Sequence, residues 1–301
     1  MSAFITITVS GLALGCVYFL VASGLSLIYG LMGVLNFAHG AFLTLGTFAG
    51  WEAATHLSAS LGVNAAFAVS LGAAVAAGAA VGLVTEVLLV RPLYGRPVSQ
   101  ILATVGVDLT VVGLLLGIFG SGSQQIVEPG WLAGVTTVAN LHLPNGNYLA
   151  IGAGLAVLNA LGWFLHRTRY GLIVRAGVEN RDMVRALGID VGRAFTLVFV
   201  IGGAAAGLAG LVDSLVFASG LTDPTQGDQL LIFAFIVVVI GGLGSLSGSA
   251  VAALVVGLVQ VYVGYYAGNG AGLAQLSNLS VMLLLALVLL VRPRGLLGRA
   301  A

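Results

Sequence analysis

The chain has 301 residues, of which 59% are hydrophobic and only 7% are charged, with a net charge of +1. A soluble domain carries roughly 25% charged residues, so this composition excludes an ordinary soluble globular protein. All 11 basic residues are arginine. A chain without lysine cannot form the ATP-binding loop whose lysine reaches the terminal phosphates. The single cysteine, Cys16, excludes an intrachain disulfide and a cysteine metal cluster.

Long apolar runs predict an all-α polytopic transmembrane bundle, formed as a single domain over residues 1–301. A spanning helix needs about 20 apolar residues, and these runs lack the ten-residue alternation of an outer-membrane barrel. We expect spans near residues 4–29, 34–55, 62–90, 100–120, 148–166, 194–219, 229–243, 249–267 and 277–291. The total of eight to ten depends on YGLMGVLNFAHG, which is either a turn between spans or a break within the membrane.

The arginines fall into three clusters, at 91–96, 167–193 and 292–299. Arginine collects in cytoplasmic loops, so all three clusters are expected on the cytoplasmic side. Even numbers of predicted spans separate them, as this placement requires, and three spans before the first cluster would put the N-terminus outside.

Glycine supplies 45 residues and recurs at four-residue spacing. Such small faces let helix backbones approach closely in lipid. We therefore expect close helix packing at the pairs Gly11/Gly15, Gly46/Gly50, Gly78/Gly82, Gly113/Gly117, Gly203/Gly207 and Gly264/Gly268.

The segment 167–193 is the only sizeable charged stretch, and its periodicity over 172–187 predicts a short amphipathic helix. Its apolar face is expected to hold Ile173, Ala176, Met183, Val184 and Leu187. Such a helix can rest in the headgroup region, or it can dock its apolar ridge into a groove on a cytosolic partner. Because the chain has no ATP-binding loop of its own, a partner that hydrolyses ATP is the economical hypothesis.

Ionisable residues within apolar runs are costly and are candidates for function. Glu86 is near enough to Arg91 to pair with it or reach the interface. Asp108 is deeper, and is either hydrogen-bonded between helices or part of a solute pathway. Asp213 is expected near the outer interface in contact with water, and Asp223 and Asp228 in an outer loop.

Glycine-rich breaks interrupt the helical pattern twice. Asn36 and His39 follow Gly30 and Gly33, which weaken the helix and free backbone groups that polar side chains can satisfy. The break is either a capped structural feature or a discontinuous helix lining a substrate route, as in many transporters. The same alternatives hold for GGLGSLSGS at 241–249.

Four stretches together resemble the branched-chain amino acid permeases of bacterial ABC importers, in particular the H-type of the two paired permeases. They are GLSLIYGLMGVLNFAHGAFLTLG (24–46), GLIVRAGVENRDMVRALGIDVGRAFTLVFVIGGAAAGLAG (171–210), FIVVVIGGLGSLSGSAVAALVVGL (235–258) and RPRGLL (292–297). NFAHG combined with VIGGLGS is the most specific part.

The resemblance implies a multi-pass permease of the bacterial inner membrane, embedded in the lipid bilayer. It implies a second homologous permease, two cytosolic ATP-binding subunits and an extracytoplasmic substrate-binding protein as partners, with no nucleic acid. It also implies that the segment near 171–190 couples to the ATPase, for which we select Arg175, Glu179, Asn180, Arg181, Asp182 and Arg185.

The combined interpretation is alternating-access import of branched-chain amino acids or similar small solutes, with Asn36, His39 and Asp108 in the pathway. The chain would catalyse no bond chemistry and would hold neither a metal nor a cofactor, because ATP and Mg²⁺ would bind the partner subunits. Urea and short amides are alternative substrates within the family. The rivals are an ion-coupled secondary transporter and an intramembrane enzyme, although no Gly-x-Ser-x-Gly, His-Glu-x-x-His or paired-aspartate signature is present.

Overall fold

The computed structural model describes residues 2–138, 141–179, 183–184, 191–268 and 276–297, and it forms an all-α helical bundle as the apolar runs predict. The helices are α1 (Ser2–Met32), α2 (His39–Leu61), α3 (Val63–Thr85), α4 (Pro97–Phe119), α5 (Gly130–Ala133), α6 (Gly146–Arg167), α7 (Arg169–Glu179), α9 (Val191–Val216), α10 (Gln226–Gly241), α11 (Leu246–Gly268) and α12 (Leu276–Val291). A π-helical turn, Glu86–Val90, and a 3₁₀ turn, Arg91–Leu93, end α3.

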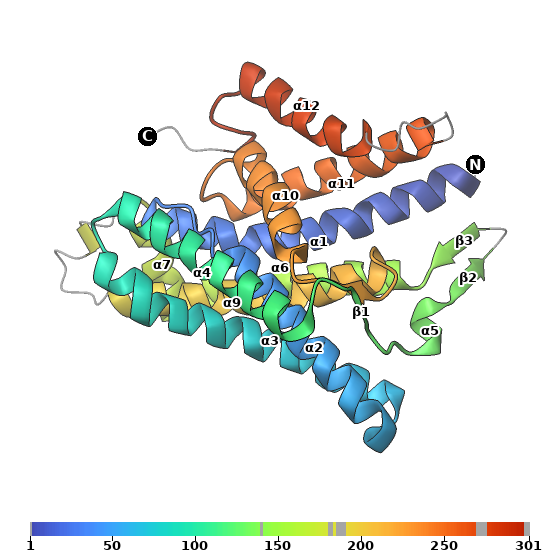
Figure 1. The fold of residues 1–301 in the computed structure, drawn as a ribbon. Helices are drawn as coiled ribbons and strands as arrows, with labels where there is room; N and C mark the ends of the chain where they lie inside the picture. The colour runs from blue at the N-terminus through green and yellow to red at the C-terminus, as the bar shows by residue number, and fades with distance from the viewer. Residues whose placement is uncertain (1, 139–140, 180–182, 185–190, 269–275, 298–301) are drawn as a thin grey trace.

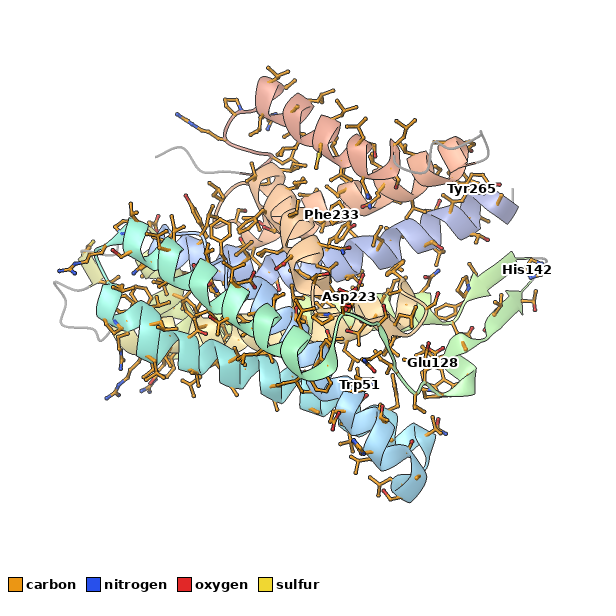
Figure 2. All side chains as sticks on the ribbon, viewed as in Figure 1. Trp51, Glu128, His142, Asp223, Phe233 and Tyr265 are labelled. Atoms are coloured by element: carbon orange, nitrogen blue, oxygen red, sulfur yellow. The ribbon has the colours of Figure 1, made fainter. Side chains whose placement is uncertain are left out.

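Four short strands lie outside the bundle core. β1 (Gln124–Gln125) pairs antiparallel with β4 (Leu221–Thr222), with Gln124 opposite Thr222. β2 (Val135–Val138) and β3 (Leu141–Pro144) form an antiparallel hairpin with Val135 opposite Pro144. The indole N–H of Trp51 donates to the Gln125 carbonyl at 3.2 Å, which ties α2 to β1. Figure 2 shows Trp51 on the lower side of the bundle and His142 at the tip of the hairpin.

Helix α1 runs through the centre of the bundle and contacts α6, α9, α10 and α11 (Figure 1). Its side chains at Val17, Leu20 and Leu25 are completely buried. The Tyr18 hydroxyl donates to Gln260 Oε1 on α11 at 2.6 Å, so two helices far apart in sequence are joined inside the bundle. A helix that is apolar on all faces is typical of a position buried among other helices, as α1 is over most of its length.

Glycine seams bring the helix backbones together, as the four-residue spacing predicts for most pairs. A Cβ on Gly78 or Gly82 of α3 would collide with the Gly203 or Phe199 carbonyl of α9, and one on Gly15 would lie 2.8 Å from the Leu254 Cα of α11. Gly113 and Gly117 are different, because nothing in the described chain lies within 4 Å of a Cβ placed there. For that pair the expected close packing is not made by the described residues.

Six described helices are long and apolar enough to cross a membrane, and α10 and α12 are shorter apolar helices. The total of eight to ten spans stays a prediction. Figure 1 places the turn from α3 into α4, α7 and the end of α12 toward one end of the bundle, with the start of α1 and the β2–β3 hairpin at the other. This arrangement agrees with the arginine clusters sharing one side.

Both predicted breaks are present. Helix α1 ends at Met32, and residues 33–38 precede α2, with Gly33 at a φ of +68° that favours glycine. Helix α10 ends at Gly241, and α11 begins at Leu246. The C-terminal segment closes the end of α10, because the backbone N–H groups of Leu296 and Leu297 donate to the Ile240 and Gly241 carbonyls at 2.7 and 3.1 Å.

Candidate functional site

The first break folds back into the bundle. His39 Nε2 lies 3.1 Å from the Val21 carbonyl, and Val21 is eleven residues before the end of α1, about 16 Å along the helix. Helix α2 therefore begins deep inside the protein and not at its surface. We call residues 33–40 the polar break. The stretch runs from exposed Gly33 to buried Gly40, and whether it is a turn between spans or a break within the membrane stays a prediction.

Polar atoms without hydrogen-bond partners gather in the polar break. Both amide atoms of Asn36 are buried and unpaired, and so is Nδ1 of His39. Asn36 is 2% exposed and His39 is completely buried. Leaving such a group unpaired costs about 1–3 kcal/mol, so these atoms are candidates for binding a polar group.

Helix α4 covers the polar break with a polar stripe. Its buried residues are Gln100, Thr104, Asp108 and Leu115, and the three polar residues are spaced four apart on one face. The backbone N–H of Phe37 donates to Thr104 Oγ1 at 3.3 Å. Asn36, Gln100 and Thr104 line one pocket, whose remaining lining is formed by Ile28, Met32, Val34, Leu35, Val90 and Phe199. The structure thus brings Asn36 to the helix that carries Asp108.

Asp108 lies at the N-terminal turn of α2, opposite a second carboxylate. A Cβ placed on Gly40 would lie 2.8 Å from Asp108 Oδ1 and 3.3 Å from Asp228 Oδ1, so both oxygens lie beside Gly40. Asp108 interacts with the Asp228 carboxyl group and with the Ala41 backbone. His39 points the other way, toward α1, where its Cε1 lies 2.9 Å from the position of a Cβ on Gly24.

The expectation that Asp228 is in an outer loop is wrong, because Asp228 belongs to the first turn of α10. The neighbouring Gly227 N–H donates to Thr44 Oγ1 at 3.2 Å, and a Cβ on Gly227 would collide with the Gly40 carbonyl, so α10 begins beside the first two turns of α2. Figure 2 shows Asp223, just before α10, nearer the middle of the bundle than Glu128 or His142. Gln100 and Thr104 were also missed, although their spacing from Asp108 in an apolar helix is a signal for them.

The sequence suggests that Asp213 is in contact with water. In the structure its carboxylate is instead hydrogen-bonded to another side chain. Its Oδ2 accepts from Gln226 Nε2 at 3.3 Å. Gln226 is itself buried, and its Oε1 accepts from the hydroxyls of Ser214 and Thr222, each at 2.9 Å. Asp213 therefore belongs to a hydrogen-bonded cluster that fixes the start of α10 against α9.

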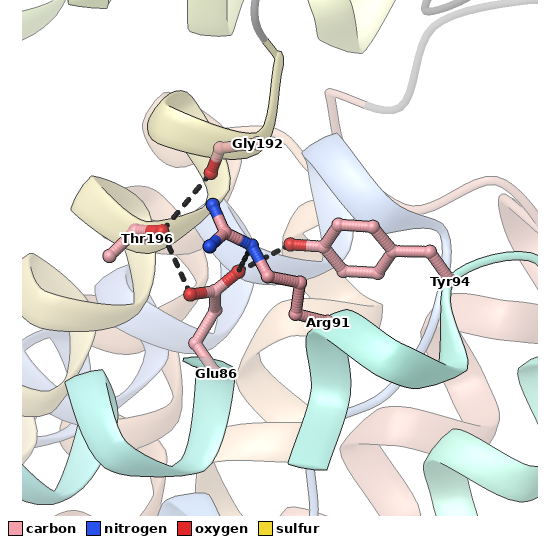
Figure 3. A network of polar contacts seen from close by, with 5 residues as sticks. All are labelled: Glu86, Arg91, Tyr94, Gly192 and Thr196. Atoms are coloured by element: carbon pink, nitrogen blue, oxygen red, sulfur yellow. Dashed lines mark hydrogen bonds and ion pairs between the residues drawn. The ribbon is translucent and has the colours of Figure 1, made fainter. Parts of the chain in front are cut away.

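Glu86 forms a separate polar cluster with Arg91, Tyr94 and Thr196 (Figure 3). Its carboxylate is completely buried and accepts from the Tyr94 hydroxyl at 2.5 Å and the Thr196 hydroxyl at 2.8 Å. Arg91 Nε lies 3.9 Å from the same carboxylate. The expected pairing with Arg91 is present, whereas the alternative that Glu86 reaches the interface is wrong. The cluster joins α3 to the beginning of α9.

The expected coupling segment is described in part. Helix α7 covers residues 169–179, and Arg175 and Glu179 are exposed on it, while Asn180, Arg181, Asp182 and Arg185 lie outside the described residues. The expected apolar face is partly wrong, since Ala176 and Met183 are exposed and the buried residues of α7 are Gly171, Val174 and Gly177. The small glycines let α7 approach its neighbours, and a Cβ on Gly177 would lie 2.7 Å from Leu31 Cδ1.

Comparison with known proteins identifies the family of this chain. Residues 7–292 match the family described as branched-chain amino acid transport system / permease component. The chain is 29% identical to BraD, a high-affinity branched-chain amino acid transport system permease protein of Pseudomonas aeruginosa, over 97% of this chain and 94% of that protein. No solved structure matches.

Two further relatives carry the same description. LivH of Escherichia coli, a high-affinity branched-chain amino acid transport system permease protein, is 27% identical over 96% of this chain and 94% of its own length. A probable branched-chain amino acid transport permease protein LivH of Methanocaldococcus jannaschii is 30% identical over 93% of this chain and 88% of its own. With six apolar helices of spanning length among the described residues, the chain is a multi-pass protein of the bacterial inner membrane. It belongs to the family of branched-chain amino acid transport system permease components.

Proposed function

We propose that the chain is a membrane-embedded subunit of an ABC importer, and that its polar break lines the path of a branched-chain amino acid or a similar small solute. The observation that carries this proposal is the connection between the buried polar break and the surface helix α7. Gly177 of α7 packs on Leu31, next to the residue that ends α1 and leads into the break. The chain's own role is transport without bond chemistry.

The polar break supplies groups that a passing solute can use. Asn36 offers an unpaired donor and an unpaired acceptor at a buried position, and Thr104 and Gln100 face it from α4. Discontinuous helices at membrane depth are tolerated where they line a cavity. Only four residues of α4 are buried, so a displacement of α4 would open this path at the loss of few buried contacts.

Helix α7 is placed to transmit movement of a cytosolic partner. Its exposed Arg175 and Glu179 are available to that partner, and its buried face contacts α1 and α6. A push on α7 reaches Gly30 and Leu31, because Val178 Cγ2 lies 3.3 Å from the position of a Cβ on Gly30. The partner would bind and hydrolyse ATP with Mg²⁺, and the same movement would alternately expose the polar break to the two sides.

The assembled transporter tests this proposal. The tagged chain is purified from solubilised membranes, and the proteins recovered with it are identified by mass spectrometry. We expect a second permease and an ATPase with a phosphate-binding loop. The complex, reconstituted with its binding protein, should take up leucine only when ATP is supplied.

The rival secondary transporter makes the opposite predictions. Recovery of the chain alone, under conditions that keep a known importer intact, contradicts the proposal. So does leucine uptake that continues without the ATPase and stops when an uncoupler removes the proton gradient.

A further inference from the structure

We propose that the carboxylates of Asp108 and Asp228 bind the ammonium group of the transported solute. This inference rests on the proposed transport function and adds a residue-level basis for substrate choice. The two residues come from α4 and α10 and meet at Gly40, which has no side chain to separate them. A Cβ at Gly40 would lie 2.8 and 3.3 Å from the two carboxylate oxygens.

Within the described part of the chain, no ion pair is recorded for Asp108 or Asp228. The ion pairs of Glu52 with His56 and of Glu86 with Arg91 include neither residue. Asp108 Oδ1 is buried without a hydrogen-bond partner. The N-terminal ends of α2 and α10 offset part of the negative charge, but they do not supply a counterion.

A protonated amine matches this arrangement. An ammonium group has three donors and no acceptor, so it can donate to both carboxylates together, and charge-assisted bonds of this type are short and strong. A metal ion is a weaker match, because the described chain has no group of three or more His, Cys, Asp or Glu side chains that could hold one.

An independent observation places the rest of the ligand. Asn36 is 2% exposed with both amide atoms unpaired, and it lines the pocket that Gln100 and Thr104 also line. Thr104 precedes Asp108 by one turn of α4, about 6 Å. The carboxylate of an α-amino acid is bonded to the same carbon as its ammonium group. The carboxylate of a solute held at Asp108 and Asp228 would therefore lie within about one turn of α4 from the pair, where the Asn36 amide can donate to it.

The test measures binding to the permease itself, without the binding protein. Saturation-transfer NMR on the purified, detergent-solubilised transporter compares leucine with 4-methylpentanoate, which has the same carbon skeleton but no amine. We expect the wild-type protein to bind leucine at least about tenfold more tightly, the order of magnitude of one charge-assisted hydrogen bond. Asp108→Asn and Asp228→Asn should each remove this preference.

Glu52→Gln serves as the matched control, because Glu52 is an exposed acidic residue on α2 that pairs with His56. It should keep the wild-type preference for leucine. Equal binding of the two compounds by the wild-type protein, absence of any leucine signal, or an unchanged preference in both aspartate variants would overturn the proposal.

Uptake into proteoliposomes separates this inference from the proposed function. If the wild-type complex imports leucine with ATP and both aspartate variants import it at the wild-type rate, the ammonium site is wrong and the transport function stands. If the wild-type complex imports no amino acid, the proposed function fails first.

Discussion

Leu31 of α1 and Gly177 of α7 are in direct contact, because a Cβ on Gly177 would lie 2.7 Å from Leu31 Cδ1. Gly177→Val should therefore push α7 away from α1 and weaken the coupling of ATP hydrolysis to transport. The expected result is normal basal ATPase activity in the assembled complex with little stimulation by the substrate-loaded binding protein. Gly162→Val on α6 is the control, since nothing in the described chain lies within 4 Å of a Cβ placed there. Normal stimulation in Gly177→Val would contradict the proposed contact route.

Charge reversal tests two acidic residues expected to couple to the ATPase. Replacing both Glu179 and Asp182 by Arg should abolish substrate-stimulated ATPase activity and leave membrane insertion intact, because rim charges set the orientation of a docked partner. Insertion is checked by the yield of monodisperse protein, and coupling by ATP hydrolysis with and without substrate. Unchanged stimulation would remove the coupling assignment.

Asn36 should be more important for transport than for stability. Asn36→Leu removes two buried unpaired polar atoms, which cost about 1–3 kcal/mol when unsatisfied, so the variant should unfold at the wild-type temperature or above. Leucine uptake should nevertheless decrease at least about tenfold, the effect of losing one strong contact. Thermal unfolding and ATP-driven uptake measure the two effects separately. A large loss of stability with normal uptake by the remaining folded protein would identify Asn36 as structural.

Glu86 should contribute mainly to stability. Glu86→Ala removes the acceptor of the Tyr94 and Thr196 hydroxyls and should destabilise the protein by about 1–3 kcal/mol. Arg91→Gln should cost less than Glu86→Ala, because Arg91 is half exposed and its Nε lies 3.9 Å from the carboxylate, whereas the two hydroxyls donate to it directly. Thermal unfolding in detergent compares the two variants. Equal effects would show that the ion pair, and not the hydroxyl bonds, stabilises the cluster.

The glycine seams predict substitutions of opposite sign. Gly203→Ala places a methyl group against the Gly78 carbonyl and should destabilise by about 1–3 kcal/mol through overpacking. Gly113→Ala meets nothing within 4 Å in the described chain and should be neutral or stabilise α4 by up to about 1 kcal/mol, because alanine is the better helix former. Unfolding temperatures of the purified variants give both values.

Much of the fold is predictable from local patterns. Apolar length gave the helices, Gly33 marked the first break, and four-residue glycine spacing marked most of the close helix contacts. Each of these signals is contained in a short stretch of sequence, so no knowledge of the neighbouring helix is needed.

The site is predictable only in part, because it is assembled from three separate helices. Asn36, His39 and Asp108 are recognisable as polar residues in apolar runs, but their arrangement is not. Asp228 looks like a loop residue until α10 is seen to begin inside the bundle. Whether a carboxylate is in a loop or beside Gly40 is decided by packing between α2 and α10, which no spacing within one segment records.

The hydrogen bond between Tyr18 of α1 and Gln260 of α11 cannot form until late in the synthesis of the chain. The ribosome adds about 5–20 residues per second, so α11 is synthesised roughly ten seconds or more after α1. During that time the Tyr18 hydroxyl and the apolar face that α11 later covers are open to lipid or to an assembly factor. A nascent chain arrested before α11 should therefore be the species that membrane chaperones and quality-control proteases recognise.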